Sequence, residues 1–188
     1  NNFVYDFLYP NPASVLAFIE NHDTDRFLGE GQNLAMLKQA TTLLLTTRRI
    51  PQLYYGTEIM MNGVKTKSDG YVRCDFPGGW AGDKQNAFTA EGRTDLQNEC
   101  YNFYKTILNW RKGNDVIAKG SMTQFMVQNG VYAYARQYEE KTVFVMLNGT
   151  DSETTLPLKF YKDILTGRTI SFTEDLKMAA RESLVIEL

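Results

Sequence analysis

The sequence is poor in the residues and patterns that mark several classes of protein. Its 188 residues include one histidine and two cysteines. No apolar run approaches the roughly 20 residues that a membrane-spanning helix needs. Basic residues number 20 and acidic residues 22, which gives a net charge of −2 and leaves no basic stripe to attract a phosphate backbone or an anionic lipid surface. We therefore expect neither a nucleic acid nor a membrane as a partner.

The cysteines and acidic residues do not form the patterns of a disulfide framework or a metal site. Cys74 lies in a loop-like stretch and Cys100 in a helical pattern, and two cysteines do not define a redox compartment. Asp69, Asp75 and Asp83 lack the alternating spacing and the glycine of a calcium loop. We expect no metal and no cofactor. The first residues lack an initiator methionine and a signal pattern, so we interpret this start as a cut or processed end.

The first half of the chain alternates between strand and helix patterns. Residues 14–20, "SVLAFIE", form a short apolar run that is typical of a buried parallel strand. Residues 34–49 carry apolar side chains at steps of three and four, which predicts a helix that ends at Pro51. Residues 51–56, "PQLYYG", predict a second buried strand. Together they predict a right-handed parallel unit.

A long loop and a second helix follow. Residues 62–93 are rich in Gly, Asp, Asn and Lys but contain four aromatic residues, so we expect an ordered and functional loop. Thr94 and Gln97 form a capping-box pair, and an apolar stripe runs from Leu96 to Leu108 before Gly113 ends the helix.

After residue 120 the periodicity changes to short strands, which is typical of a β-sandwich. Asn129 and Gly130 suit a tight hairpin between the first two strands. The predicted fold is therefore α/β followed by all-β, with domains at residues 1–117 and 118–188. The strands are expected at "TQFMVQ", "VYAYARQ", "TVFVMLN", "TTLPL" and "SLVIEL".

A polar cluster stands where the first strand ends, which is where a parallel α/β barrel places its chemistry. It consists of Asn21, His22, Asp23, Asp25 and Arg26. A carboxylate beside an imidazole can hold a polyhydroxylated ligand, because the carboxylate accepts hydrogen bonds from hydroxyl groups and the ring donates one. The same residues also suit a helix cap with no ligand, and this alternative stays open.

Three segments resemble glycoside hydrolase family 13, the α-amylase family. "FIENHDTDRF" (residues 18–27) resembles the signature after the family's seventh barrel strand, and "PQLYYGTE" (residues 51–58) resembles its eighth strand. "DILTGRTI" (residues 163–170) resembles the closing β-domain. The neopullulanase and cyclomaltodextrinase branch is the most similar, although Asp25 replaces its usual Glu. The resemblance implies the last part of a TIM (β/α)8 barrel, about strands 7–8 with their helices, and a C-terminal antiparallel β-sandwich.

The family hydrolyses α-glucosidic bonds with retention through a carboxylate nucleophile and a protonated carboxylic acid. By resemblance, Asp23 is a third carboxylate that stabilises the transition state, and His22 and Asn21 bind the same sugar. Arg26 is a further substrate-binding candidate, although an ion pair that orders the loop is the favoured role. The implied substrate is an α-glucan or malto-oligosaccharide, and the implied location is periplasmic or secreted.

The family's nucleophile and acid lie on earlier strands, and nothing in this sequence matches them. The chain alone is therefore expected to be inactive. A quarter of a barrel also exposes sheet edges and an apolar helix face, so we expect a crystallised fragment or a piece that self-associates through these edges.

The long loop carries further candidates for substrate binding. Asp69 and Arg73 resemble a pair that some exo-acting members use at the sugar end, and Trp80 is placed to stack on a glucose face. Each of the three also has an ordinary structural interpretation.

Two alternative functions remain open at this stage. One is a noncatalytic family relative that acts as a binding or partner domain, against which the complete Asn21–His22–Asp23 run speaks. The other is a carbohydrate-binding module in the β-sandwich, in which Tyr132 and Tyr134 on one face of a strand would form an aromatic platform.

Overall fold

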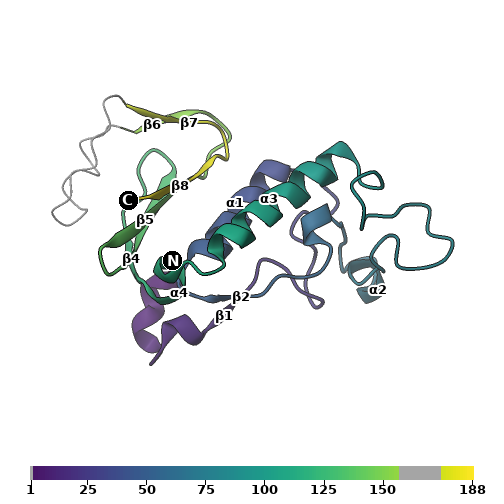
Figure 1. The fold of residues 1–188 in the computed structure, drawn as a ribbon, viewed down its shortest axis with the longest axis horizontal. Helices are drawn as coiled ribbons and strands as arrows, with labels where there is room; N and C mark the ends of the chain where they lie inside the picture. Colours follow the sequence, from purple (N-terminus) through teal and green to yellow (C-terminus); the bar gives the residue numbers. More distant parts are fainter. Residues whose placement is uncertain (1, 157–174) are drawn as a thin grey trace.

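The computed structural model describes residues 2–156 and 175–188, and Figure 1 shows their arrangement. Two long helices lie side by side in the centre, with an antiparallel sheet at one end and a long loop at the other. The segment "DILTGRTI" (residues 163–170) lies outside the described residues. In the part of the chain that is described, no helix has the length and apolar character to cross a membrane.

The predicted strand–helix–strand unit is present, but its strands are shorter than expected. Strand β1 (Leu16–Ala17) pairs in parallel with β2 (Ile50–Pro51), and helix α1 (Leu34–Thr46) connects them. The predicted second strand at residues 51–56 is wrong in its bounds, since β2 begins one residue earlier and ends at Pro51. The prediction that both strands are buried is also wrong, because Leu16 and Ile50 are about half exposed. In residues 2–156 and 175–188 each of these strands pairs with the other alone.

Side-chain caps mark the starts of the two long helices. The Asn33 side chain accepts the backbone N–H of Met36 at the start of α1, as expected of an N-cap. Helix α3 (Asp95–Arg111) begins with the predicted capping box of Thr94 and Gln97 and is followed by Gly113, which has a φ of +78°. The core between the two helices contains Leu34, Leu37, Met60, Cys100 and Tyr104.

Shorter helical turns complete this half of the chain. They are η1 (Asn2–Leu8), η2 (Pro12–Ser14), η3 (Thr57–Ile59) and α2 (Asp69–Val72), and a five-residue helix α4 (Asp115–Lys119) precedes the sheet. The predicted long loop at residues 62–93 contains buried Val72 and Ala87, whereas its Trp80 and Phe88 are mostly exposed. Phe76 and Phe88 pack within it with ring centroids 4.6 Å apart, and α2 is the one element in it that the sequence did not predict.

The second half forms a four-stranded antiparallel sheet with the order β3–β4–β5–β8. The pair β6 and β7 forms a separate two-stranded sheet. The strand bounds are β3 (Ser121–Gln124), β4 (Val131–Tyr138), β5 (Lys141–Asn148), β6 (Thr154–Leu156), β7 (Leu176–Met178) and β8 (Ser183–Glu187). Strand β7 was not predicted, and the first predicted strand is wrong in extending to Gln128. The hairpin turn at Asn129 and Gly130 is confirmed, with φ values of +48° and +77°.

The four-stranded sheet is covered on both faces. On one face Phe144 and Met146 pack with Leu156 of β6 and Met178 of β7. On the other face Tyr134 packs with residues of α4 and its surroundings. Tyr134 is fully buried, and Tyr132 belongs to the same core cluster. The hypothesis that Tyr132 and Tyr134 form the aromatic platform of a carbohydrate-binding module is therefore wrong, because both rings belong to the core cluster on the face of the sheet that is covered by the helices.

Candidate functional site

The loop after β1 is shaped by Asn21. Its side-chain oxygen accepts the backbone N–H of Asp23 at 2.8 Å, and its own backbone N–H donates to the hydroxyl of Thr24 at 3.0 Å. These bonds close a tight turn in which local side chains replace backbone partners. In this structure Asn21 therefore sets the direction of the His22 and Asp23 side chains.

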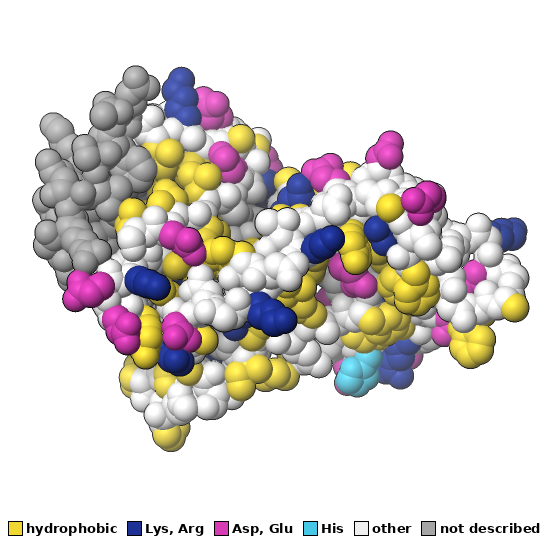
Figure 2. Space-filling view, in the orientation of Figure 1, with side chains coloured by type: hydrophobic (Ala, Val, Ile, Leu, Met, Phe, Trp, Pro, Cys, Tyr) yellow, Lys and Arg dark blue, Asp and Glu magenta, His cyan; other side chains and the backbone are white. Residues whose placement is uncertain are grey.

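Asp23 is the centre of an exposed polar cluster. One carboxylate oxygen lies 3.2 Å from Nε2 of His22, and the other lies 3.1 Å from Nη2 of Arg73. The side chains of Asp23 and His22 are 62% and 59% exposed, so both are open to a ligand. In Figure 2 the histidine lies on the molecular surface beside basic and acidic side chains.

The structure brings Asp69 and Arg73 to this cluster, although Arg73 lies 50 residues after Asp23 in the sequence. Asp69 is the first residue of the short helix α2 and Arg73 directly follows its last, and Nη2 of Arg73 lies 3.3 Å from Asp69 Oδ2. The Nε of Arg73 also donates to the backbone oxygen of His22 at 2.9 Å. Arg73 thus joins the long loop to the loop after β1.

Lys65 is a member of the cluster that the sequence did not indicate. Its ammonium donates to the backbone oxygen of Asp23 at 3.0 Å and lies 3.2 Å from Asp69 Oδ1. The hydrogen bond and charge of Lys65, followed by the charge of Arg73, lower the pKa of Asp69 below its ordinary value. The four-residue spacing between Lys65 and Asp69 is a weak signal in a loop, because only a helical turn brings such residues together.

A buried frame lies beneath the cluster and involves Arg26. Its guanidinium has no exposed surface and forms an ion pair with Glu20 at 3.1 Å. It also donates to the backbone oxygens of Tyr55 and Val72 and stacks 4.0 Å from the Tyr54 ring centroid. This placement favours the predicted ordering role of Arg26 over a direct ligand contact.

Glu20 completes the frame by accepting the hydroxyl of Thr57 and the backbone N–H of Phe27. The frame therefore connects the ends of β1 and β2 with the long loop. Sequence reasoning missed Glu20 and Thr57, because a buried carboxylate with these partners becomes visible only when the strands are placed together.

Trp80 stands apart from these residues. It is 67% exposed, and its backbone N–H donates to the Asp83 carboxylate at 3.1 Å. Among the described residues no hydrogen bond or ion pair joins Trp80 to Asp23, Asp69 or Arg73. Across the same residues, no group of three or more His, Cys, Asp or Glu side chains is arranged to hold a metal ion.

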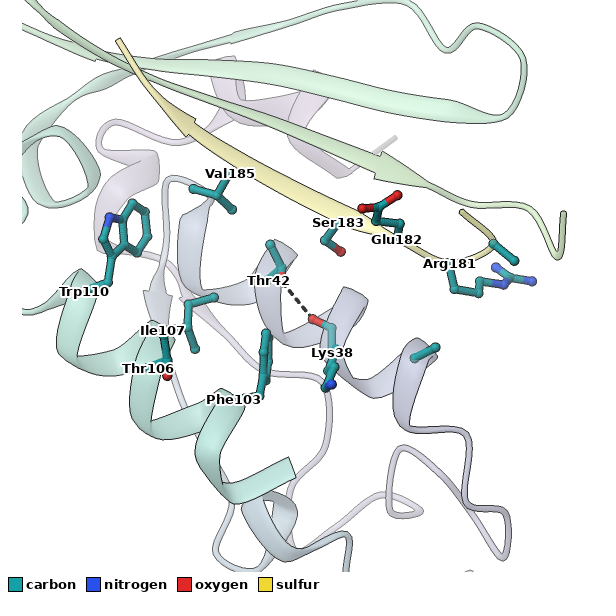
Figure 3. A pocket seen from close by; sticks show the side chains of 12 residues that line it. Lys38, Thr42, Phe103, Thr106, Ile107, Trp110, Arg181, Glu182, Ser183 and Val185 are labelled. Atoms are coloured by element: carbon teal, nitrogen blue, oxygen red, sulfur yellow. Dashed lines mark hydrogen bonds between the residues drawn. The ribbon is translucent and has the colours of Figure 1, made fainter. Parts of the chain in front are cut away.

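A separate cavity of 520 Å³ lies between α1, α3 and the start of β8 (Figure 3). Phe103, Ile107 and Trp110 line it from α3, and Val185 faces them from β8. Lys38 at its edge forms an ion pair with Glu99, at 2.6 Å. Its lining is mostly apolar, and none of the cluster around Asp23 contributes to it, so we do not treat it as the reactive site.

The sequence is similar to known enzymes and to one protein family. Residues 122–187 match the family described as Cyclo-malto-dextrinase C-terminal domain. The chain is 32% identical over 162 residues to a cyclomaltodextrin glucanotransferase of Paenibacillus macerans, which covers 82% of this chain and 20% of that protein. It is 33% identical over 165 residues to an α-amylase of Niallia circulans, covering 84% of this chain and 28% of that protein. The chain thus spans between a fifth and a third of the length of these relatives.

Solved structures agree on the fold. A debranching enzyme of Nostoc punctiforme superposes with a TM-score of 0.74 at 20% identity, covering 98% of this chain and 36% of that chain. At this identity the likeness concerns the fold alone.

Proposed function

Because this chain belongs to glycoside hydrolase family 13, the α-amylase family, we propose that it forms the C-terminal part of an enzyme that cleaves α-glucosidic bonds. Asp23 is its transition-state carboxylate in this proposal. The cyclomaltodextrinase branch is supported for residues 122–187 by the matching family description.

The observation that carries the proposal is the position of Asp23 in the loop after β1. Its carboxylate is exposed, and His22 and Arg73 contact its two oxygens from different segments. Carboxylate, imidazole and guanidinium groups together supply the acceptors and donors that vicinal sugar hydroxyls require. A structural cap of a helix needs neither the imidazole nor the second segment.

In the proposed reaction, Asp23 accepts hydrogen bonds from hydroxyls of the sugar at the cleaved bond. A stronger grip on the distorted, oxocarbenium-like ring than on the relaxed ring lowers the barrier. The nucleophile and the general acid belong to barrel strands outside this sequence, so residues 1–188 alone are proposed to be inactive. The proposal concerns bond cleavage, a step common to hydrolysis and glucosyl transfer.

We also propose that residues 1–117 end the barrel and residues 118–188 form the closing β-domain. The parallel pairing of β1 and β2 supports this division, as do the exposed apolar residues beside the two strands, Leu16, Phe18, Ile50 and Leu53. In the whole protein these side chains would pack against the other barrel strands; a free chain would associate through them. The proposed substrate is an α-glucan or malto-oligosaccharide, and the proposed location is periplasmic or secreted.

The test is malto-oligosaccharide cleavage by the full-length parent enzyme with Asp23→Asn, which removes the charge and keeps the volume. We expect kcat to fall by about a hundredfold or more, because a charged group aimed at the transition state is lost. Asp75→Asn, an exposed acid in the long loop, serves as the matched control and is expected to retain activity within about twofold. Circular dichroism spectra of both variants should match the wild type.

Unchanged turnover in Asp23→Asn would make the cluster structural. If the wild-type protein cleaves no α-glucan, the noncatalytic binding or partner domain becomes the better explanation.

A further inference from the structure

Asp25 and Lys65 form a connection that holds the long loop on the loop after β1. Asp25 Oδ1 accepts the backbone N–H of Lys65 at 2.6 Å, across 40 residues of sequence. This bond fixes the backbone of residue 65 beside the turn that carries Asp23.

The Lys65 side chain extends this connection to the ligand-facing groups. Its ammonium binds the backbone oxygen of Asp23 and Oδ1 of Asp69, at 3.0 Å and 3.2 Å. Arg73 binds the other oxygen of Asp69, Oδ2, and also Oδ1 of Asp23. Asp69 is therefore held by one cation on each oxygen, and both cations are also bonded to Asp23.

Without Lys65, Asp69 would keep Arg73 as a partner but lose the bond that ties it to the Asp23 backbone. A carboxylate with one partner on an exposed loop has more rotational freedom than one held on both oxygens. Lys65 is 39% exposed at its side chain, so the ion pair is partly screened and its effect on binding is moderate.

We infer that Lys65, anchored by Asp25, is a positioning residue that holds Asp69 and Arg73 in register with Asp23 for sugar binding. The inference rests on the proposed function for the identity of the ligand. Lys65 acts through Asp69 and the loop backbone, whereas Asp23 acts on the reacting sugar. The two residues should therefore differ in which kinetic constant they control.

The first test measures the anchor without using activity. Hydrogen exchange of the segment 62–69 in the full-length protein should be faster in Asp25→Ala, because the Lys65 amide loses its acceptor. Asp25→Asn retains an acceptor oxygen and should restore most of the protection. Equal exchange in the wild type and Asp25→Ala would overturn the anchoring.

The second test separates binding from chemistry in the full-length enzyme with malto-oligosaccharides. Lys65→Met should raise KM about three- to fivefold and leave kcat within about twofold, as expected when uniform binding is lost through an exposed ion pair. Lys65→Arg keeps the charge and should restore KM. Lys67→Met is the matched control, because Lys67 lies on the same loop as Lys65 but pairs with Glu30, from the segment before α1, and forms no hydrogen bond or ion pair with the described residues of the cluster. The KM of Lys67→Met should equal that of the wild type.

The outcomes separate this inference from the proposed function. An unchanged KM in Lys65→Met, or an equal rise in Lys67→Met, overturns the role of Lys65 while the loss of kcat in Asp23→Asn still supports the enzyme. If the wild-type protein has no activity, the proposed function is wrong. Hydrogen exchange then decides whether Asp25 anchors the Lys65 backbone.

Discussion

Arg136 on β4 donates from Nη1 to the backbone oxygen of Thr46, 2.8 Å away at the last residue of α1. Its Nη2 donates to the carbonyls of Ile117 and Gly120 around the end of α4, and its Nε donates to that of Ser121. Burial lowers the pKa of Arg136 to about 10, so the group remains charged at neutral pH. One side chain thus joins two helix ends to the sheet, where carbonyl groups without helical partners favour a cation.

Replacing Arg136 with methionine should destabilise the chain strongly. Methionine has a similar length but no donor, so four carbonyl groups lose a partner in a buried site. We expect the free energy of unfolding to fall by about 3–5 kcal/mol, measured by urea unfolding. Lys119→Met removes an exposed cation at the end of α4 and should change the midpoint little. A similar loss in both variants would show that Arg136 has no special role.

Asp6 should make the free energy of unfolding depend on pH in the acidic range. Burial alone would raise the pKa of Asp6, but hydrogen bonds and charges of Arg49 and Arg48 lower it below the ordinary value of 3.8. A lowered folded-state pKa adds stability that is fully present above the unfolded-state value and is lost as pH falls through the folded-state value.

Asp6→Asn should therefore be less stable than the wild type at pH 7, with a difference that shrinks once the pH falls below about 3.8. Urea midpoints measured across this range check the prediction. A difference that is constant at all pH values would mean that the Asp6 charge contributes nothing.

Gly130 and Gly113 form a matched pair that separates backbone strain from steric clash. Their φ values are +77° and +78°, but an added Cβ would meet Thr150 Cγ2 at Gly130 and open space at Gly113. Gly113→Ala should cost about 1 kcal/mol from the left-handed conformation alone. Gly130→Ala should cost about 1–3 kcal/mol more, because Thr150 must move. Equal losses in urea unfolding would show that the hairpin accommodates the methyl group freely.

Sequence predicts best those features that depend on neighbouring residues. The capping box at Thr94 and Gln97 and the hairpin at Asn129 and Gly130 were both confirmed, since each needs only a few adjacent residues to form. Helix α1 was predicted to within a few residues of its end. The polar turn at residues 21–23 was also recognisable, because it directly follows the apolar run at residues 14–20.

Features that depend on distant segments were not predictable in the same way. Strand lengths depend on the neighbouring strands available for pairing, and within the described part of the chain β1 and β2 pair only with each other. The connection from Asp25 to Lys65 spans 40 residues, and Arg26 contacts Val72 across 46. No local pattern marks such contacts, so Asp69 and Arg73 were named from resemblance, and Lys65 was missed.

The buried contact between Glu20 and Arg26 divides the polar cluster into a stiff half and an adjustable half. Asp23 lies in the turn that rests on this buried frame, and Arg26 of the frame also binds the backbone oxygen of buried Val72 on the long loop. The side chains of Asp69 and Arg73, in contrast, are held by exposed bonds. Exchanges of exposed side chains within residues 62–80, with buried Val72 kept, would therefore reshape what lies around the carboxylate while leaving the carboxylate in place. A protein engineer would vary that loop to alter ligand choice, and would leave residues 20–26 untouched.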